Sequence, residues 1–192
     1  FQNPEDQLFG SSALEEVTFG PKNLGASQEQ IERQTEKALS MVGLLSYASE
    51  HPYNMTYGQR KMLCLASVLA MDPAVIIMDE PNAGQDYHGL HLLTSIIDQL
   101  KSMGKTIVII SHDMELIAKE CEQAALMRDG RVIAYSSTRS ILSDPSSLAL
   151  SSVRPPQVTR LAIKLVSRRI RHDILTVEEM IQVLLELKTR AP

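Results

Sequence analysis

The sequence predicts an α/β fold built around a mainly parallel sheet. Two short apolar runs, Val75–Met78 and Thr106–Ile110, carry no polar alternation, which is typical of strands buried on both faces. Between them, apolar residues recur at helical spacing from Leu90 to Leu100. Strands that alternate with helices usually pair in parallel, so this order of elements predicts a parallel sheet.

The segment before the first strand is predicted to be mostly helical. Residues 1–20 are expected to form loops and turns, because Gly20–Pro21 interrupts regular structure. Helical spacing follows, at Ile31, Thr35, Ala38, Leu39 and Val42. A turn over residues 51–58 then leads into a helix predicted from about Gln59 to Met71.

The segment after the second strand is predicted to finish the sheet and to add a helical tail. A helix is expected from Asp113 to Glu120, and Asp129–Gly130 between two apolar runs indicates a β-hairpin. Further helices are predicted over residues 160–170 and after the capping box Thr176–Glu179. The expected parts of the chain are residues 1–72, 73–143 and 144–192.

The composition is that of a soluble globular protein. The chain has 192 residues, of which 44% are hydrophobic and 22% charged, and a net charge of -4 gives no general reason to expect nucleic acid. No apolar run approaches the roughly 20 residues that span a bilayer. The chain begins without an initiator methionine, which predicts a fragment. Cys64 and Cys121 lack metal-ligand spacing, which favours reduced thiols in a reducing compartment.

Polar side chains follow both predicted strands directly. Asp79 and Glu80 end the first strand, and Ser111–His112–Asp113 ends the second. Ligands of open α/β sheets bind at the carboxyl ends of the strands. There Asp79 has the chemistry to coordinate Mg²⁺, Glu80 to activate a water, and His112 to donate to a charged phosphate. The alternative for each is structural: a solvated turn for Asp79–Glu80 and a packed histidine for His112.

Several motifs occur in one order along the chain. They are Phe1–Phe9, Met55–Gln59, Val75–Glu80, Ala83–Asp86 and His112. In this order they resemble the Q-loop, signature, Walker B, D-loop and switch histidine of ATP-binding cassette (ABC) transporter ATPases. The energy-coupling-factor and cobalt-uptake ATPases of prokaryotes are the most similar subgroup, because the stretch Arg154–Arg160 also resembles part of their C-terminal tail.

The resemblance implies a fold, a reaction and a set of site residues. The fold is the C-terminal part of a P-loop NTPase (RecA-like) core with a helical subdomain and a small helical tail. The cofactors are ATP and Mg²⁺. The implied catalytic residues are Glu80, His112 and Gln2, and the metal ligands are Asp79 and Gln2. The residues that meet the partner's nucleotide or the dimer interface are Thr56, Gly58, Gln59 and Asp86.

The resemblance also implies partners and a location. The partners are a second ATPase subunit, in a homodimer or heterodimer, and integral membrane transport subunits that face about residues 2–60. The protein would lie in the cytoplasm at the inner face of the cell membrane and power an importer of metal ions or vitamins. Cobalt, nickel and vitamins are all open as cargo.

The signature segment departs most from the family pattern. Thr56 keeps the hydroxyl of the family's serine, but Tyr57 replaces a glycine where backbone crowds a phosphate. Asn82 also differs from the usual residue, with little expected consequence. Tyr57 motivates an alternative function, a degenerate regulatory cassette that pairs with a competent ATPase without hydrolysing ATP itself.

A phosphate-binding loop of the form GxxxxGK[ST] is not found in the sequence. Gly104–Thr106 matches only the end of this motif, because Gln99 occupies the position of the first glycine. The triplet is also predicted to lead from a helix into a strand, which is the reverse of a phosphate-binding loop. We therefore expect this chain alone to bind ATP very weakly and not to hydrolyse it measurably, although a parent protein with the loop would.

The tail carries a cluster of basic residues without intervening acids. They are Arg154, Arg160, Lys164, Arg168, Arg169 and Arg171. Nucleic acid or anionic lipid is one possible partner for them. A solvated helix face or a docking surface between ATPase subunits is favoured, because no aromatic residues interleave for base stacking. A chromosome-maintenance ATPase is disfavoured, because sustained heptads are missing.

Overall fold

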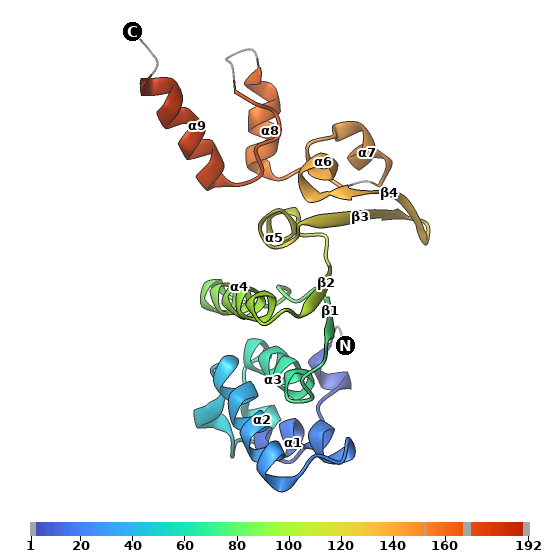
Figure 1. Ribbon diagram of the computed structural model, residues 1–192, viewed down its shortest axis with the longest axis vertical. Helices are drawn as coiled ribbons and strands as arrows, with labels where there is room; N and C mark the ends of the chain where they lie inside the picture. Colours follow the sequence, from blue (N-terminus) through green and yellow to red (C-terminus); the bar gives the residue numbers. More distant parts are fainter. Residues whose placement is uncertain (1–2, 152, 167–169, 190–192) are drawn as a thin grey trace. The chain divides into compact units, whose positions relative to one another are not determined.

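A computed structural model describes residues 3–151, 153–166 and 170–189. The chain divides into two compact units, Phe1–Ile110 and Ser111–Pro192, and each is described by itself (Figure 1). Among the described residues, no helix combines the length and apolar character needed to cross a bilayer. The expected division into three parts at residues 72 and 143 stays a prediction.

The first unit contains a helical part followed by a strand–helix–strand motif. Its elements are η1 Pro4–Asp6, α1 Ala13–Asn23, α2 Gln28–Met41, η2 Leu45–Tyr47, η3 Pro52–Asn54, α3 Tyr57–Leu69, β1 Val75–Asp79, α4 Tyr87–Ser102 and β2 Thr106–Ile110. Strands β1 and β2 pair in parallel, from Val75 opposite Thr106 to Asp79 opposite Ile110. The predicted parallel α/β arrangement is therefore confirmed.

Helix α4 packs one face of its surface into the core of this unit. The buried residues of that face are Leu93, Ile96, Ile97 and Leu100. They join Ile76 and Met78 of β1 and Leu63 of α3 in one apolar cluster. One face of β1 is thus anchored by buried side chains of α3 and α4.

The expectation of loops and turns over residues 1–20 is wrong from Ala13 onward, where α1 begins. The Ser12 hydroxyl caps this helix by accepting from the Glu15 N–H at 3.1 Å. Ala13, Val17 and Pro21 recur every four residues and are all buried. Burial of this face outweighs the helix-breaking tendency of a glycine and a proline near the end of the helix.

The expectation that both strands are buried on both faces is also wrong. Ile76 and Met78 are 2% and 6% exposed, whereas Val75 and Ile77 on the opposite face are 53% and 67% exposed. Val108 and Ile110 of β2 are exposed as well. An unbroken apolar run indicates that both faces of a strand are hydrophobic, but it does not predict whether other parts of the chain cover both faces. Exposed apolar surface of this kind is typical of interfaces.

The second unit consists of a hairpin and short helices. Its elements are α5 Met114–Glu120, β3 Gln123–Arg128, β4 Arg131–Ser137, α6 Thr138–Leu142, α7 Pro145–Leu150, α8 Gln157–Lys164 and α9 Val177–Thr189. Strands β3 and β4 pair antiparallel and leave Asp129–Gly130 as the turn, which confirms the predicted hairpin. The helix expected over residues 160–170 is α8, which begins directly after Pro156 and ends at Lys164, and residues 167–169 of the expected range lie outside the described part of the chain.

Helix α9 begins where the capping box predicts, but the box is only half formed. The Glu179 N–H donates to the Thr176 hydroxyl at 3.2 Å. The Glu179 carboxylate accepts from the Leu175 N–H at 2.9 Å and pairs with the guanidinium of Arg139. The Arg139 hydrogen bonds lower the pKa of Glu179 and hold it charged. An ion pair thus fastens α9 to α6.

Candidate functional site

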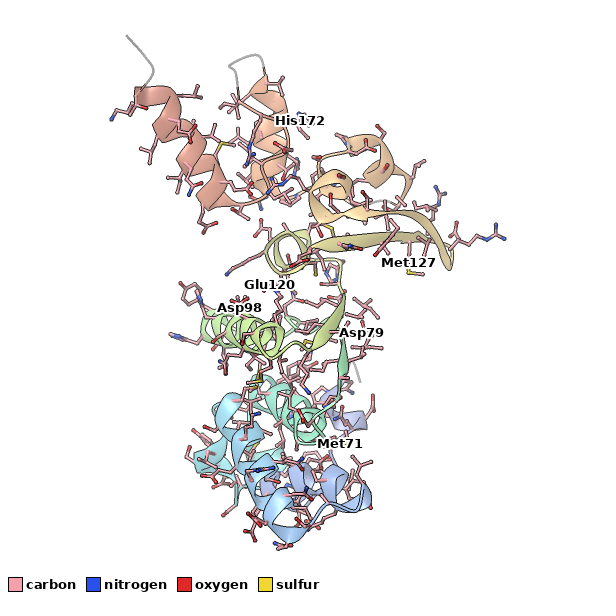
Figure 2. The ribbon with its side chains drawn as sticks, in the orientation of Figure 1. Met71, Asp79, Asp98, Glu120, Met127 and His172 are labelled. Carbon is pink, nitrogen blue, oxygen red and sulfur yellow. The ribbon has the colours of Figure 1, made fainter. Side chains whose placement is uncertain are left out.

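The carboxylates predicted to act on a nucleotide lie at the carboxyl end of β1. Asp79 is the last residue of the strand and is exposed (Figure 2). The Glu80 N–H donates to the Ile110 carbonyl at 2.8 Å, which extends the parallel ladder by one step. Glu80 has a φ of 45°, a left-handed conformation that is uncommon for a residue other than glycine. The chain therefore turns sharply at the residue predicted to activate water.

A lysine of α3 holds this turn. The Lys61 ammonium donates to the Glu80 carbonyl at 2.7 Å and to the Ala83 carbonyl at 3.1 Å. Burial lowers the pKa of Lys61, and the charges of Glu80 and Asp79 oppose that shift. Lys61 was not predicted from the sequence, because no motif marks a lysine whose partners are backbone carbonyls about twenty residues away.

The signature segment, Met55–Gln59, opens α3 as expected. The Thr56 hydroxyl accepts from the Gln59 N–H at 3.2 Å, and the Gln59 side-chain oxygen accepts from the Thr56 N–H at 2.9 Å. This is a full capping box, so both side chains have a structural role at the start of α3. The first turn of α3 also carries the partial positive charge of a helix N-terminus, which favours an anion.

The D-loop, Ala83–Asp86, lies against the signature segment within the first unit. The Gln85 amide donates to the Gly58 carbonyl at 3.4 Å. The Tyr57 ring covers Gly84 so closely that a Cβ atom there would lie 2.6 Å from Tyr57 Cδ1. The Asp86 carboxylate caps α4 by accepting from the Gly89 N–H at 2.8 Å. The structure thus brings Thr56, Gly58, Gln59 and Asp86 into two adjoining turns.

Two predicted catalytic residues cannot be placed with this group. Gln2 lies outside the described residues. His112 follows the end of β2 by two residues and belongs to the second unit, so its position beside Asp79 stays a prediction. Asp113 caps α5 through its carboxylate, which accepts from the Glu115 N–H at 2.9 Å.

A cavity of about 100 Å³ lies beside Asp79 and is lined by Lys61, Gln85 and Gln7 among others. The Gln7 amide donates to the Cys64 carbonyl at 3.3 Å and to the Ser67 hydroxyl at 3.1 Å, which fixes the N-terminal segment against α3. Within the described ranges, no group of three or more His, Cys, Asp or Glu side chains is arranged to hold a metal. One exposed carboxylate nevertheless suits Mg²⁺, which typically keeps water and substrate phosphate oxygens as its other ligands.

A parallel strand that ends in two carboxylates, next to a capped glycine-containing turn, is typical of nucleotide-binding α/β proteins. Residues 1–83 match the ABC transporter family. A putative ABC transporter ATP-binding protein of Methanosarcina acetivorans is 38% identical over all of this chain and 31% of its own length. The energy-coupling factor transporter ATP-binding protein EcfA of Methanocaldococcus jannaschii is 35% identical over 84% of this chain and 58% of its own length.

A solved structure shows the same relationship. CbiO1 from Clostridium perfringens, described as part of the ABC transporter complex CbiONQ, superposes with a TM-score of 0.68 and 30% identity. The match covers 84% of this chain and 64% of CbiO1. The chain is therefore similar to ABC ATPases, and its relatives include energy-coupling-factor and cobalt-import ATP-binding proteins. It spans about a third of the length of the Methanosarcina relative and three fifths of the length of EcfA.

Proposed function

We propose that this chain supplies the Walker B, D-loop and signature elements of the ATP-hydrolysing subunit of an ABC importer for metal ions or vitamins. The observation that carries the proposal is the placement of Asp79 and Glu80 at the carboxyl end of β1, in the unit where the D-loop contacts the signature segment. Relatives named for energy-coupling-factor transport and cobalt import support the transport role.

The proposed chemistry divides the work among a few side chains. Mg²⁺ bound with ATP would neutralise phosphate charge, and the exposed carboxylate of Asp79 is suited to hold it, with Gln2 as a second ligand. Glu80 would accept a proton from the attacking water or orient that water, an effect worth roughly 10²–10⁴ in rate. His112 would donate a hydrogen bond to the terminal phosphate as its charge grows.

The signature segment is proposed to act on the nucleotide of a second ATPase subunit. Gly58 and the first turn of α3 offer N–H groups to an anion, while the Thr56–Gln59 capping box keeps that turn in shape. Asp86 would lie at the interface of the two subunits. Residues 1–192 contain no phosphate-binding loop, and we propose that they do not hydrolyse ATP measurably by themselves.

A membrane partner is proposed to dock on the first unit. Phe9 and Phe19 are 64% and 48% exposed, and their rings meet edge to face with centroids 4.6 Å apart. Leu14 and Leu24 are exposed on the same helical part. Aromatic and aliphatic side chains of this kind anchor protein interfaces. The proposed location is accordingly the cytoplasmic face of the cell membrane, with no nucleic acid as partner.

Phosphate release from MgATP tests the proposal. The complete gene product that contains these residues is expected to hydrolyse MgATP, and Asp79→Asn should abolish the stimulation by Mg²⁺. Residues 1–192 alone, assayed at millimolar MgATP, should stay at background. Turnover by the isolated chain close to that of the complete protein would refute the proposed role of the phosphate-binding loop.

A second candidate is a regulatory cassette that pairs with a competent ATPase. The observation that favours it is Tyr57, whose ring is packed over Gly84 at the signature segment. If Tyr57 weakens the site, Tyr57→Gly in the complete protein raises turnover. An unchanged rate counts against the regulatory function.

A further inference from the structure

Lys61 connects three parts of the candidate site through one ammonium group. It lies on α3, two residues after the signature segment, and it is half-buried. Its ammonium donates to the Glu80 carbonyl at 2.7 Å and to the Ala83 carbonyl at 3.1 Å. Each of these partners is fixed backbone, so the geometry does not depend on the rotamer of a second long side chain.

The first acceptor, the Glu80 carbonyl, belongs to the residue that is predicted to activate water. It accepts from the Ala83 N–H at 3.1 Å as well as from Lys61. The next residue is Pro81, which has no N–H to contribute to the turn. Two donors on one carbonyl fix the plane of the Glu80–Pro81 peptide, and with it the direction in which the Glu80 side chain leaves the backbone.

That direction needs support, because Glu80 adopts a left-handed φ of 45°. Such a conformation persists in a non-glycine residue only where its surroundings hold it. Lys61 supplies a charge-assisted hydrogen bond at this point, which is stronger than one between neutral groups.

The second acceptor extends the connection to the D-loop. Ala83 begins the D-loop, and the Gln85 amide of the same loop donates to the Gly58 carbonyl of the signature segment. A displacement of the first turns of α3 would therefore carry the D-loop and the Glu80 peptide with it.

We propose that Lys61 is a positioning residue that fixes the backbone of Glu80 for hydrolysis and couples the signature helix to the D-loop. The inference rests on the proposed ATPase function for its catalytic consequence. Its structural part, the anchoring of the turn over residues 80–83, is measurable without any nucleotide.

Three variants of the complete gene product distinguish loss of the Lys61 hydrogen bonds from the general effect of removing a lysine. Lys61→Met removes the donors and keeps an unbranched side chain, whereas Lys61→Arg keeps a cation with several donors. Lys37→Met is the matched control. Lys37 is an exposed lysine of α2 in the same unit, and it makes no hydrogen bond or ion pair within the part of the chain that the structure describes.

Hydrogen exchange measures the anchoring directly. In Lys61→Met we expect the Ala83 amide, which donates to the Glu80 carbonyl, to exchange roughly tenfold faster or more, because the turn opens more often. Exchange of the β2 amides should not change, and Lys37→Met should behave as the wild type. Unchanged Ala83 exchange in Lys61→Met would overturn the proposal.

Steady-state kinetics measure the catalytic consequence. Lys61→Met should lower kcat roughly tenfold or more and change KM for MgATP less than about twofold, and Lys61→Arg should recover most of kcat. A wild-type kcat in Lys61→Met would also overturn the proposal. If the wild type does not hydrolyse MgATP, the proposed ATPase function fails, and the Ala83 exchange alone decides the role of Lys61. Should Lys61→Met fail to fold, Lys61→Gln replaces it in both measurements.

Discussion

Replacement of Gly84 by alanine should destabilise the first unit more than the backbone conformation alone explains. Gly84 has a φ of 74°, and the Tyr57 ring lies where the new Cβ would be placed. Gly104 has the same φ of 74°, with no atom within 4 Å of its would-be Cβ. The two glycines therefore separate the effect of conformation from the effect of contact.

The magnitude follows from these two contributions. Alanine in the left-handed region costs about 1–2 kcal/mol, and this contribution applies to both Gly84→Ala and Gly104→Ala. Forcing a methyl group against a packed ring adds about 1–3 kcal/mol. Tyr57 is 40% exposed and has room to move toward solvent, which puts the contact contribution at the lower end of that range. We expect a loss of about 2–3 kcal/mol for Gly84→Ala and about 1–2 kcal/mol for Gly104→Ala.

The assay is urea unfolding followed by far-ultraviolet circular dichroism, applied to the wild type and to both glycine variants. Tyr57→Ala, alone and combined with Gly84→Ala, completes a double-mutant cycle. Without the ring, Gly84→Ala should retain only its conformational cost, so the coupling energy between positions 57 and 84 should be about 1 kcal/mol.

Equal losses for the two alanine variants would rule out a contribution from the Tyr57 ring. So would a coupling energy within about 0.5 kcal/mol of zero, the range expected of independent sites. Either result would mean that the Tyr57 ring does not rest on the D-loop in solution.

Three further predictions concern other parts of the chain. Burial raises the pKa of the Cys64 thiol to about 12, so mass spectrometry should find Cys64 unmodified by a thiol reagent at neutral pH until urea unfolds the chain. Thr56→Ala should lower the free energy of unfolding by about 1 kcal/mol through loss of the α3 cap, whereas Thr56→Ser should lower it little. Hydrogen bonds from Arg139 lower the pKa of Glu179 in the folded state. The pair therefore stabilises the second unit at pH values above the unfolded-state pKa of Glu179, and this stabilisation is lost as the pH falls through the folded-state pKa. The urea concentration at the unfolding midpoint should accordingly decrease as the pH is lowered below about 5. Arg139→Met should weaken this dependence of the midpoint on pH.

Much of the fold was predictable because local chemistry and tertiary packing agree in these segments. Short apolar runs without polar alternation predicted both strands of the parallel pair, and Asp129–Gly130 predicted the hairpin. Helix α1 was not predictable in the same way, because Gly20–Pro21 oppose it locally. The face formed by Ala13, Val17 and Pro21 becomes favourable only once it is buried.

The site shows the same limit. The place of Asp79 and Glu80 at the end of a strand was predictable, because they directly follow an apolar run, and their role on a nucleotide stays a prediction. The contact of Lys61 with two carbonyls leaves no sequence signal, since any neighbouring backbone offers the same acceptor. The packing of Tyr57 on Gly84 was likewise hidden, because it joins two turns that are 27 residues apart only after β1 has folded against α3.

The proposed ATPase function requires that the carboxylates at the end of β1 act on ATP. Steady-state hydrolysis of MgATP by Glu80→Gln in the complete gene product tests it most directly. Glutamine keeps the shape of the side chain and cannot take up a proton, so kcat should fall roughly 10²–10⁴-fold while KM stays within about twofold. A Glu80→Gln protein with the kcat of the wild type would mean that Glu80 does not act on the attacking water.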